Sequence, residues 1–336
     1  MMRHRLRCPG LRLHVQRRVL HFRAPKRTSL HTLRERVTYI ITARDAEGRE
    51  GHGESCRMPG RSPEPEAGYA EALEAACRRV EAQGELPPDD LRDFPSARFG
   101  IECALMDLLD LWPKEPARAE LHRLIWPGTA EDMLAAMEQG AQQGFRVLKF
   151  KLGALPFAEE LDLVREAARR FPHLTLHGDA NGAFLPAELL PRAEALAEAG
   201  LHWLEQPLPP GSPDSAALRR ALPLPVALDE ELTPHCSREA REQLLDELKP
   251  DMIIIKPMLH GGLAGAEEWA AAAEARGIAW RANSALESHI GLQALLRWCA
   301  HRAPGAIQGL GTGQLFTDDL PTPLRFCPPH LFFDII

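Results

Sequence analysis

The chain has 336 residues, of which 45% are hydrophobic and 26% charged, and its net charge is −7 at pH 7. This length suits one large or two medium-sized domains, and the negative charge argues against nucleic acid as the main partner. No apolar stretch reaches the ~18 residues of a membrane span and the first ten residues lack the apolar segment of a secretory signal, so we expect a cytoplasmic protein without a membrane partner.

Residues 1–115 predict an α+β domain with a core of its own. In residues 11–23 arginine alternates with Leu, Val and Phe, a pattern typical of a half-solvated strand rather than of a basic arm that binds nucleic acid. Residues 36–55 predict two strands joined by a turn, and the stretches 66–84 and 96–112 have helical patterns. The second of these helices is strongly apolar, which indicates that it is buried.

Residues 116–313 repeat a unit of about 26 residues: a short apolar run, a polar or charged residue, a loop and an amphipathic helix. The apolar runs end at Trp126, Lys151, Asp179, Glu205, Asp229, Lys256, Asn283 and Gly309. Eight strands alternating with seven helices predict a (β/α)7β barrel of the TIM type. A doubly wound open sheet is the alternative, but no Gly-X-Gly-X-X-Gly motif follows the first strand. Residues 314–336, rich in proline, are expected to pack back on the first domain.

Lysine is rare in this chain, since only six of its 40 basic side chains are lysines. Arginine keeps its proton near neutral pH whereas lysine can lose it, so lysines in apolar surroundings are candidates for proton transfer. The seven cysteines are scattered and form no Cys-X-X-Cys motif, which favours reduced thiols over disulfides or a zinc site.

The strand predicted within RVLKFKLG (146–153) carries Lys149 and Lys151 on the same face. Two ammonium groups about 6.6–6.8 Å apart on a strand repel each other by roughly 2–2.5 kcal/mol at an effective dielectric constant of about 20. That repulsion lowers a lysine pKa from ~10.4 to roughly 9, and burial or a nearby cation lowers it further. We therefore expect Lys149 to tune Lys151 as a general base.

Charged residues gather at the predicted strand ends, where a TIM-type barrel carries its active site. Three carboxylates come from consecutive strands, and lysines precede and follow them: Lys149, Lys151, Asp179, Glu205, Asp229 and Lys256. Burying unpaired charges costs several kcal/mol each, so the cluster has to hold something that neutralises it. Three oxygen ligands without His or Cys suit Mg²⁺, with Mn²⁺ as a substitute. A purely ionic network of lysines and carboxylates is the alternative.

A lysine base beside a carboxylate-bound cation fits removal of a proton next to a substrate carboxylate. We therefore expect a small carboxylate as the partner of this site. The sequence does not indicate the oligomeric state. A catalytically silent barrel that serves as a binding protein is a further alternative, but three of the six lysines fall at the site, which argues against it.

Six short segments, in order and at matching spacing, resemble the enolase superfamily and, more narrowly, its muconate cycloisomerase subgroup. They are KFK (149–151), DAN (179–181), EQP (205–207), LDE (228–230), IIIKP (253–257) and SALES (284–288). GHGES (51–55) is similar to a glycine-rich turn of that subgroup's capping domain. The resemblance implies an N-terminal capping domain, completed by the C-terminal segment, over a barrel that binds Mg²⁺ through Asp179, Glu205 and Asp229. It assigns supporting roles to Asn181 and Glu230.

Within the subgroup, residues 282–296 and 309–319 are most similar to o-succinylbenzoate synthases. This resemblance implies the syn-dehydration of 2-succinyl-6-hydroxy-2,4-cyclohexadiene-1-carboxylate in menaquinone biosynthesis. Lys151 would remove the α-proton and return it to the departing hydroxide, while Lys256 would stabilise the intermediate. Lys149 would tune Lys151 and help to hold the substrate carboxylate.

The chain departs from some relatives in ways that bear on the reaction. Subgroups with a histidine base carry it near the end of the seventh strand, where this chain has Asn283, and serine-rich relatives have hydroxyls where it has Asn283 and Ala285. Substrate binding there is assigned to Asn283, Ser284 and Ala285, mainly through the Ser284 hydroxyl and backbone N–H groups.

A dipeptide epimerase, an N-acylamino acid racemase or a cycloisomerase is the runner-up. The Gly-Gly-Met-X-Glu segment of N-acylamino acid racemases is missing, and Asp318 and Asp319 come too late for the acidic motif of dipeptide epimerases. Both absences argue against these two activities, although they use the same pair of lysines. Capping-domain loops near residues 22–30 and 57–62 are expected to close the site.

Overall fold

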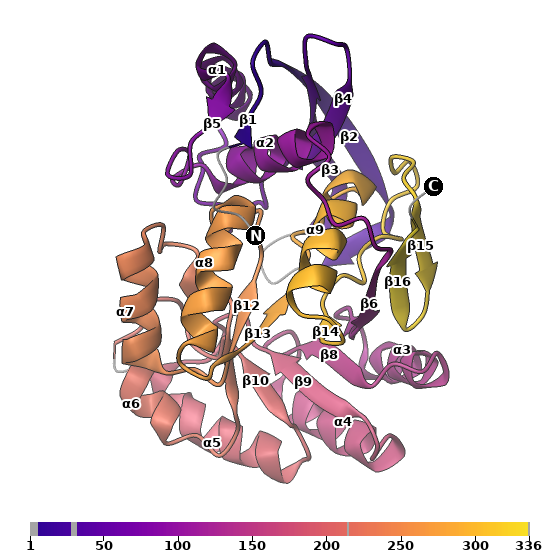
Figure 1. Cartoon of the computed structure of the whole chain (residues 1–336). Helices are drawn as coiled ribbons and strands as arrows, with labels where there is room; N and C mark the ends of the chain where they lie inside the picture. The colour runs from indigo at the N-terminus through magenta and orange to yellow at the C-terminus, as the bar shows by residue number, and fades with distance from the viewer. Residues whose placement is uncertain (1–5, 28–31, 214, 335–336) are drawn as a thin grey trace.

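The computed structural model describes residues 6–27, 32–213 and 215–334. Figure 1 shows an α+β domain from the N-terminal part of the chain seated on one end of a barrel formed by the rest. One of the two loops expected to close the site, near residues 22–30, falls partly outside the described residues. No helix in the described ranges has both the length and the apolar character that crossing a bilayer requires.

The N-terminal capping domain contains a three-stranded antiparallel sheet in the order β2-β3-β4, with two helices packed against it. The main elements are β2 (Arg12–Arg27), β3 (Thr32–Arg44), β4 (Glu50–Ser55), α1 (Tyr69–Gln83) and α2 (Pro95–Leu108), and β1 (Leu6–Arg7) pairs with β5 (Glu85–Leu86). Helix α2 is buried along nearly its whole length because it also contacts α8 and α9 of the barrel. Its apolar sequence is explained by this position between the sheet and the barrel.

The segment GHGES forms strand β4 rather than a turn. A Cβ atom on Gly53 would lie 1.9 Å from the carbonyl oxygen of Gly100 in α2, and one on Gly51 would lie 2.4 Å from that of Ala104. Both glycines therefore allow the strand backbone to lie directly on the helix backbone. This close approach brings Glu54, which directly follows Gly53 in the strand, to the surface of the barrel.

The barrel is built from parallel strands whose neighbours in space are also neighbours in sequence, from β7 to β13. Its strands are β6 (Ala117–Leu121), β7 (Arg123–Ile125), β8 (Val147–Lys151), β9 (Thr175–Asp179), β10 (Trp203–Glu205), β11 (Val226–Leu228), β12 (Met252–Ile255), β13 (Ala279–Ala282) and β14 (Ile307–Gln308). Strand β14 pairs with β6, which leads into β7, and a bridge between Asn283 and Gly309 joins it to β13. The sheet therefore closes, and the predicted barrel with its capping domain is confirmed.

Seven α-helices alternate with these strands in the described residues. They are α3 (Ala130–Gln142), α4 (Phe157–Arg170), α5 (Pro186–Glu198), α6 (Ser215–Arg220), α7 (Arg238–Leu248), α8 (Gly262–Glu274) and α9 (His289–Arg302), with a short 3₁₀ helix η1 (Glu230–Leu232) after β11. The central strands are almost continuously apolar, as in β12, because helices cover their outer face and side chains fill the interior.

Two buried carboxylates of the capping domain dock it on the N-termini of barrel helices. Glu54 accepts hydrogen bonds from the backbone N–H and the hydroxyl of Ser288 (3.0 and 2.6 Å) and from the N–H of Gly291 (2.9 Å), at the start of α9. Glu102 of α2 accepts one from the N–H of Leu263 (2.6 Å), at the start of α8. Each carboxylate satisfies N–H groups that the helix itself leaves unpaired and complements its dipole. The loop before α9 is therefore held by both domains.

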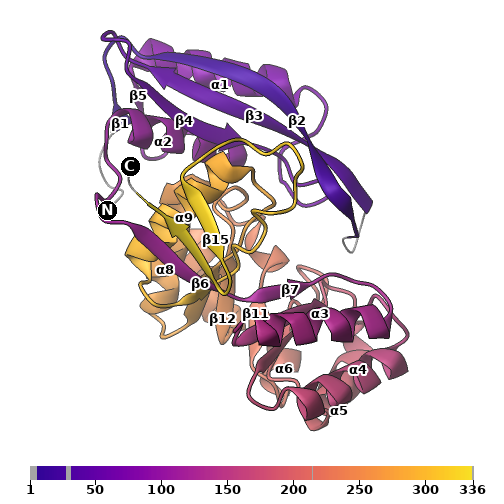
Figure 2. The same cartoon turned by 90° about the vertical axis from the view of Figure 1, so that its right-hand side faces the viewer.

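The C-terminal segment touches both domains. Residues 315–318 run beside β2, where the N–H of Arg23 donates to the carbonyl of Leu315 (2.8 Å) and the rings of Phe22 and Phe316 lie 4.7 Å apart. The hairpin of β15 (Leu324–Cys327) and β16 (His330–Phe333) then pairs antiparallel with β6. In Figure 2 this yellow hairpin lies against β6, below the β2–β3 sheet. The domain boundaries drawn from the sequence, 1–115, 116–313 and 314–336, remain a prediction.

Candidate active site

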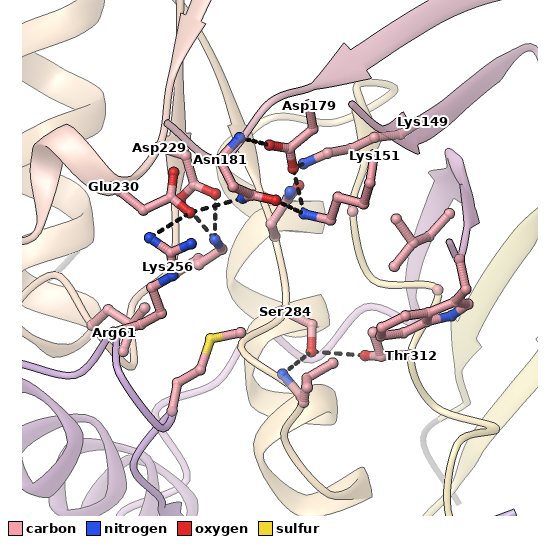
Figure 3. A pocket seen from close by; sticks show the side chains of 18 of the residues that line it. Arg61, Lys149, Lys151, Asp179, Asn181, Asp229, Glu230, Lys256, Ser284 and Thr312 are labelled. Atoms are coloured by element: carbon pink, nitrogen blue, oxygen red, sulfur yellow. Dashed lines mark hydrogen bonds and ion pairs between the residues drawn. The ribbon is translucent and has the colours of Figure 1, made fainter. Parts of the chain in front are cut away.

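A pocket lies at the carboxyl ends of the barrel strands, between the barrel and the capping domain. Residues on or just after most of the barrel strands line it, together with three from the capping segment at residues 58–61 and Leu33 of β3. Figure 3 shows lysines and carboxylates on one side of this pocket and the Ser284 and Thr312 hydroxyls on another. The predicted active-site end of the barrel is thus the end that the capping domain covers.

The parallel register places the predicted charged residues side by side at the carboxyl ends of neighbouring strands. Lys151 of β8 is paired with Asp179 of β9, which in turn is paired with Glu205 of β10. Asp229 directly follows β11 and Lys256 directly follows β12. Because each residue is the last of its strand or the next one, their side chains converge at the mouth of the barrel.

Each lysine of the cluster contacts a carboxylate. Lys149 Nζ lies 3.0 Å from Asp179 Oδ2 and 2.5 Å from Glu205 Oε1, and Lys151 Nζ lies 2.7 Å from the same Asp179 oxygen. Across the pocket, Lys256 Nζ lies 2.7 and 2.5 Å from the two oxygens of Asp229. A carboxylate oxygen therefore lies between Lys149 and Lys151, so a repulsion between two isolated ammonium groups does not describe this site.

Burial and charge act against each other in this cluster. Burial would lower the pKa of Lys149, but the three surrounding carboxylates outweigh burial and raise it above its usual value. Burial would raise the pKa of Asp179, but Lys149 and Lys151 hold it well below its usual range. For Glu205, burial and the charge of Asp179 act together and raise the pKa to about 8. A cation bound beside these carboxylates would favour the charged form of Glu205.

The three carboxylates fit a divalent cation. One oxygen from each of Asp179, Glu205 and Asp229 lies within 4.8 Å of the others, and all three side chains are buried. Oε2 of Glu205 makes no hydrogen bond to any described residue. The nearby His177 Nε2, at 2.9 Å, forms an ion pair with it only if the histidine is protonated. Buried carboxylate oxygens without nearby Cys ligands are the donors that Mg²⁺ and Mn²⁺ prefer. These three residues could therefore hold the predicted metal.

The two supporting residues expected from the sequence contact each other. Asn181 Oδ1 accepts a hydrogen bond from Lys151 Nζ (2.6 Å), and Asn181 Nδ2 donates one to Glu230 Oε1 (2.8 Å). Burial and the neighbouring charge of Asp229 raise the pKa of Glu230 to about 7. Asn181 therefore connects Lys151, the predicted base, to Glu230, which directly follows Asp229 in the chain.

Of the three residues assigned to substrate binding, two line the pocket and one does not. Asn283 and Ser284 line the pocket, whereas Ala285 is fully buried and its N–H donates to the Glu287 carboxylate (2.8 Å). The Ser284 hydroxyl also donates to Glu287 and accepts from the hydroxyl of Thr312 (2.7 Å). The proton of the Ser284 hydroxyl thus points to a protein carboxylate, and its assignment to the substrate remains a prediction.

Among the pocket residues that the sequence analysis did not name as site residues are a cation and an aromatic ring. Arg61 comes from the capping-domain loop expected to close the site, and its Nη1 lies 3.1 Å from Glu230 Oε1. Trp126 directly follows β7 and lines the pocket, and Lys26 lies over its ring, with Nζ 5.3 Å from the ring centroid. Only the position of Arg61 within a predicted closing loop could have indicated it.

Comparison with known proteins agrees with this geometry. A family model described as enolase C-terminal domain-like matches residues 132–325. An o-succinylbenzoate synthase from Desulfotalea psychrophila is 35% identical, over 94% of this chain and 97% of the relative. The crystal structure of MenC from Desulfotalea psychrophila has a TM-score of 0.83 at 32% identity, covering 96% of this chain and 99% of that one.

A dipeptide epimerase from Enterococcus faecalis has a similar structure. Its complex with Mg and the dipeptide L-Leu-L-Tyr has a TM-score of 0.82 at 20% identity, covering 96% of both chains. At this identity the likeness concerns the fold alone. The same barrel and capping domain therefore occur in proteins whose names denote different reactions.

Proposed function

The chain belongs to the enolase C-terminal domain-like family and is an enzyme of the lyase type, and from this premise we propose that it catalyses the reaction of an o-succinylbenzoate synthase. The substrate would be 2-succinyl-6-hydroxy-2,4-cyclohexadiene-1-carboxylate, an intermediate of menaquinone biosynthesis. Loss of the proton next to its carboxylate and of its hydroxyl group gives an aromatic ring and one molecule of water. The 35% identity to a relative of that name, over nearly the whole chain, supports this choice.

In the proposed reaction Lys151 Nζ, as the neutral amine, takes the proton from the carbon that bears the carboxylate. The electron pair of that C–H bond moves toward the carboxylate and gives an enediolate. The pair then returns to the ring as the bond to the hydroxyl oxygen breaks, and Lys151 gives its proton to the departing hydroxide. Atoms and charge balance, because the proton and the hydroxide leave together as water.

Other residues of the cluster supply electrostatic stabilisation. Lys256, on the opposite side of the carboxylates from Lys149, would place a positive charge beside the intermediate, and Lys149 would help to hold the substrate carboxylate. Asp179, Glu205 and Asp229 would hold Mg²⁺, or Mn²⁺ in its place. When bound, that ion would offset the negative charge that develops on the substrate carboxylate.

The single observation that carries this proposal is that Lys149, Lys151 and Lys256 line one pocket at the buried carboxylate group of Asp179, Glu205 and Asp229. The experiment is an assay of the purified chain on the cyclohexadiene substrate, following the aromatic product by its ultraviolet absorbance. The proposed function predicts turnover that stops when EDTA is added and returns with Mg²⁺ or Mn²⁺. Full activity in excess EDTA would contradict the metal, and no aromatic product would contradict the reaction.

An epimerase or racemase is the second candidate, because it needs one base on each side of the α-carbon. Lys151 lies against Asp179 and Lys256 against Asp229, so the pocket holds a lysine on each of two sides. The substrate would again be a small carboxylate, such as a dipeptide or an N-acylamino acid. Neither reaction needs nucleic acid or a membrane, and we propose a cytoplasmic location on the sequence grounds given above.

A further inference from the structure

An ion pair joins the capping domain to the barrel at the mouth of the pocket. Arg61 Nη1 lies 3.1 Å from Glu230 Oε1, and the two side chains are only 18% and 8% exposed. A tight turn sets the position of Arg61, since the N–H groups of Arg61 and Ser62 both donate to the carbonyl of Met58 (3.0 and 2.9 Å). The pair therefore forms only when this turn lies over the barrel.

The carboxylate that pairs with Arg61 also reaches the base through one side chain. Glu230 Oε1 accepts from Asn181 Nδ2 at 2.8 Å, and Asn181 Oδ1 accepts from Lys151 Nζ at 2.6 Å. Figure 3 shows Arg61, Glu230, Asn181 and Lys151 in this order across the pocket. Three polar contacts thus connect a capping-domain turn to the nitrogen that would take the substrate proton.

The chemistry of each group fixes the direction of the Asn181 amide. Glu230 Oε1 faces the guanidinium of Arg61 and therefore accepts, and Lys151 has N–H groups to donate both as an ammonium and as the neutral amine. Turning the amide over would place its NH₂ against Lys151 and its oxygen against Glu230, which loses both contacts. The Asn181 backbone is held as well, because its N–H donates to Asp179 Oδ1 (3.0 Å). Its φ of 46° lies in a region that asparagine tolerates better than most residues.

We propose that Arg61 and Glu230 are positioning residues that act on Lys151 through Asn181. Glu230 orients the amide, the amide oxygen holds Lys151 Nζ, and Arg61 makes this alignment depend on the capping turn being seated over the pocket. The base is then aligned when the pocket is covered and less well aligned when it is open. This inference deepens the proposed function, since it rests on the role of Lys151 as the base.

A second ion pair between the domains provides a matched control. Arg92 of the capping domain contacts Glu268 of α8, with both nitrogen–oxygen distances at 2.9 Å, and the two side chains are 26% and 27% exposed. Neither residue lines the pocket. Arg92→Met therefore removes an ion pair between the same two domains without touching the contacts that lead to Lys151.

The test compares kcat and KM for the wild type, Arg61→Met, Arg61→Lys, Asn181→Ala, the double variant Arg61→Met/Asn181→Ala, and Arg92→Met. Misalignment of the base predicts a fall in kcat of about tenfold to hundredfold for Arg61→Met, while KM changes by less than about threefold. Arg61→Lys should recover most of the kcat because it restores the charge. In the Asn181→Ala background, Arg61→Met should cost less than about twofold, since contacts in one network are not additive.

Three results would overturn the proposal. A rise in KM alone for Arg61→Met would mean that Arg61 binds substrate directly. Fully additive losses with Asn181→Ala would mean that the two residues act independently. An equal loss of kcat in Arg92→Met would mean that domain docking in general, not this network, supports catalysis.

Two further steps distinguish these outcomes from misfolding of a variant and from an error in the proposed reaction. If Arg61→Met does not fold, Glu230→Gln, which keeps the volume and an acceptor oxygen but loses the charge, takes its place with the same expected direction. All ratios are measured on whichever substrate the wild type turns over, the cyclohexadiene or an N-acylamino acid. An error in the proposed reaction therefore leaves this test intact.

Discussion

The charged side and the uncharged side of the pocket have different origins. The charged side consists of residues at the ends of consecutive strands, and the parallel register sets their places: Lys149, Lys151, Asp179, Glu205, Asp229 and Lys256. The uncharged side comes from both domains and from loops, with the side chains of Leu33, Met58, Trp126, Ser284, Leu286 and Thr312. In the proposed function the chemistry is thus tied to the barrel, whereas the shape of the pocket depends on how the two domains meet.

The largest effect is expected on the charged side, from Lys151→Arg. Arginine keeps a positive charge beside Asp179 but cannot supply a neutral base near pH 7, so kcat should fall by roughly 10³–10⁴-fold. The measurement is steady-state turnover together with exchange of the α-proton for deuterium in D₂O. Lys114→Arg is the matched control, because Lys114 is an exposed lysine that pairs with Asp110 of the capping region. Near-normal turnover of Lys151→Arg would move the proton transfer to another residue.

Lys256→Ala should separate dehydration from racemisation. If Lys256 only stabilises the intermediate, dehydration should slow by roughly 10²–10³-fold, while exchange of the α-proton by Lys151 persists on a slow analogue that keeps its leaving group. In a two-base racemase the same change should abolish exchange from one enantiomer of an N-acylamino acid and spare the other. The measurement is deuterium incorporation for the wild type, Lys151→Ala and Lys256→Ala with both substrate classes. Enantiomer-selective exchange without dehydration would favour the second candidate.

Glu205→Gln tests the metal directly. The change keeps the shape of the side chain but removes one of three negative charges, so affinity for Mn²⁺ should fall by at least about 100-fold. Isothermal calorimetry or the electron paramagnetic resonance signal of free Mn²⁺ measures this without any assay of activity. Glu287→Gln is the control, because Glu287 is another buried carboxylate of the barrel but lies outside the group of three. Unchanged Mn²⁺ affinity in Glu205→Gln would support the purely ionic network of lysines and carboxylates.

The contrast between the two sides also explains what the sequence could and could not predict. Each charged residue stands at the end of an apolar run, and the regular spacing of these runs was enough to predict the barrel, its strand ends and their convergence. The contact between Asp179 and both Lys149 and Lys151 was missed, because it depends on the register between neighbouring strands. Periodicity predicts where a strand ends but not which atom its last side chain meets.

The sequence could not predict contacts between the two domains, for a different reason. Arg61 is 169 positions before Glu230 in the chain, and their ion pair exists only because α2 and β4 dock the capping domain on α8 and α9. Lys26 of the capping domain is half-buried over Trp126 of the barrel, and burial lowers its pKa. In both cases the partner comes from the other domain, so no local pattern in the sequence indicates the contact.

The smallest effect is expected on the uncharged side, from Ser284→Ala. The Ser284 hydroxyl donates to Glu287 and accepts from both the Thr312 hydroxyl (2.7 Å) and the Leu286 N–H (3.0 Å), so its capacity is used within the protein. Removing it leaves the buried Glu287 carboxylate with one donor fewer, which should lower the free energy of unfolding by about 1–3 kcal/mol. It should raise the pKa of Glu287 still further above its usual value, because burial already raises that pKa and the Ser284 hydrogen bond opposes it.

Urea denaturation and steady-state kinetics on Ser284→Ala measure these effects separately. If the hydroxyl serves the protein, stability falls while KM changes by less than about threefold, since the substrate loses no contact. Thr312→Val is the matched variant, because it removes only the donor to Ser284 and should cost about 1 kcal/mol or less. A rise in KM of about tenfold for Ser284→Ala, equivalent to ~1.4 kcal/mol, without loss of stability would instead show that this hydroxyl turns toward the substrate. The uncharged side would then bind substrate through polar contacts as well as through shape.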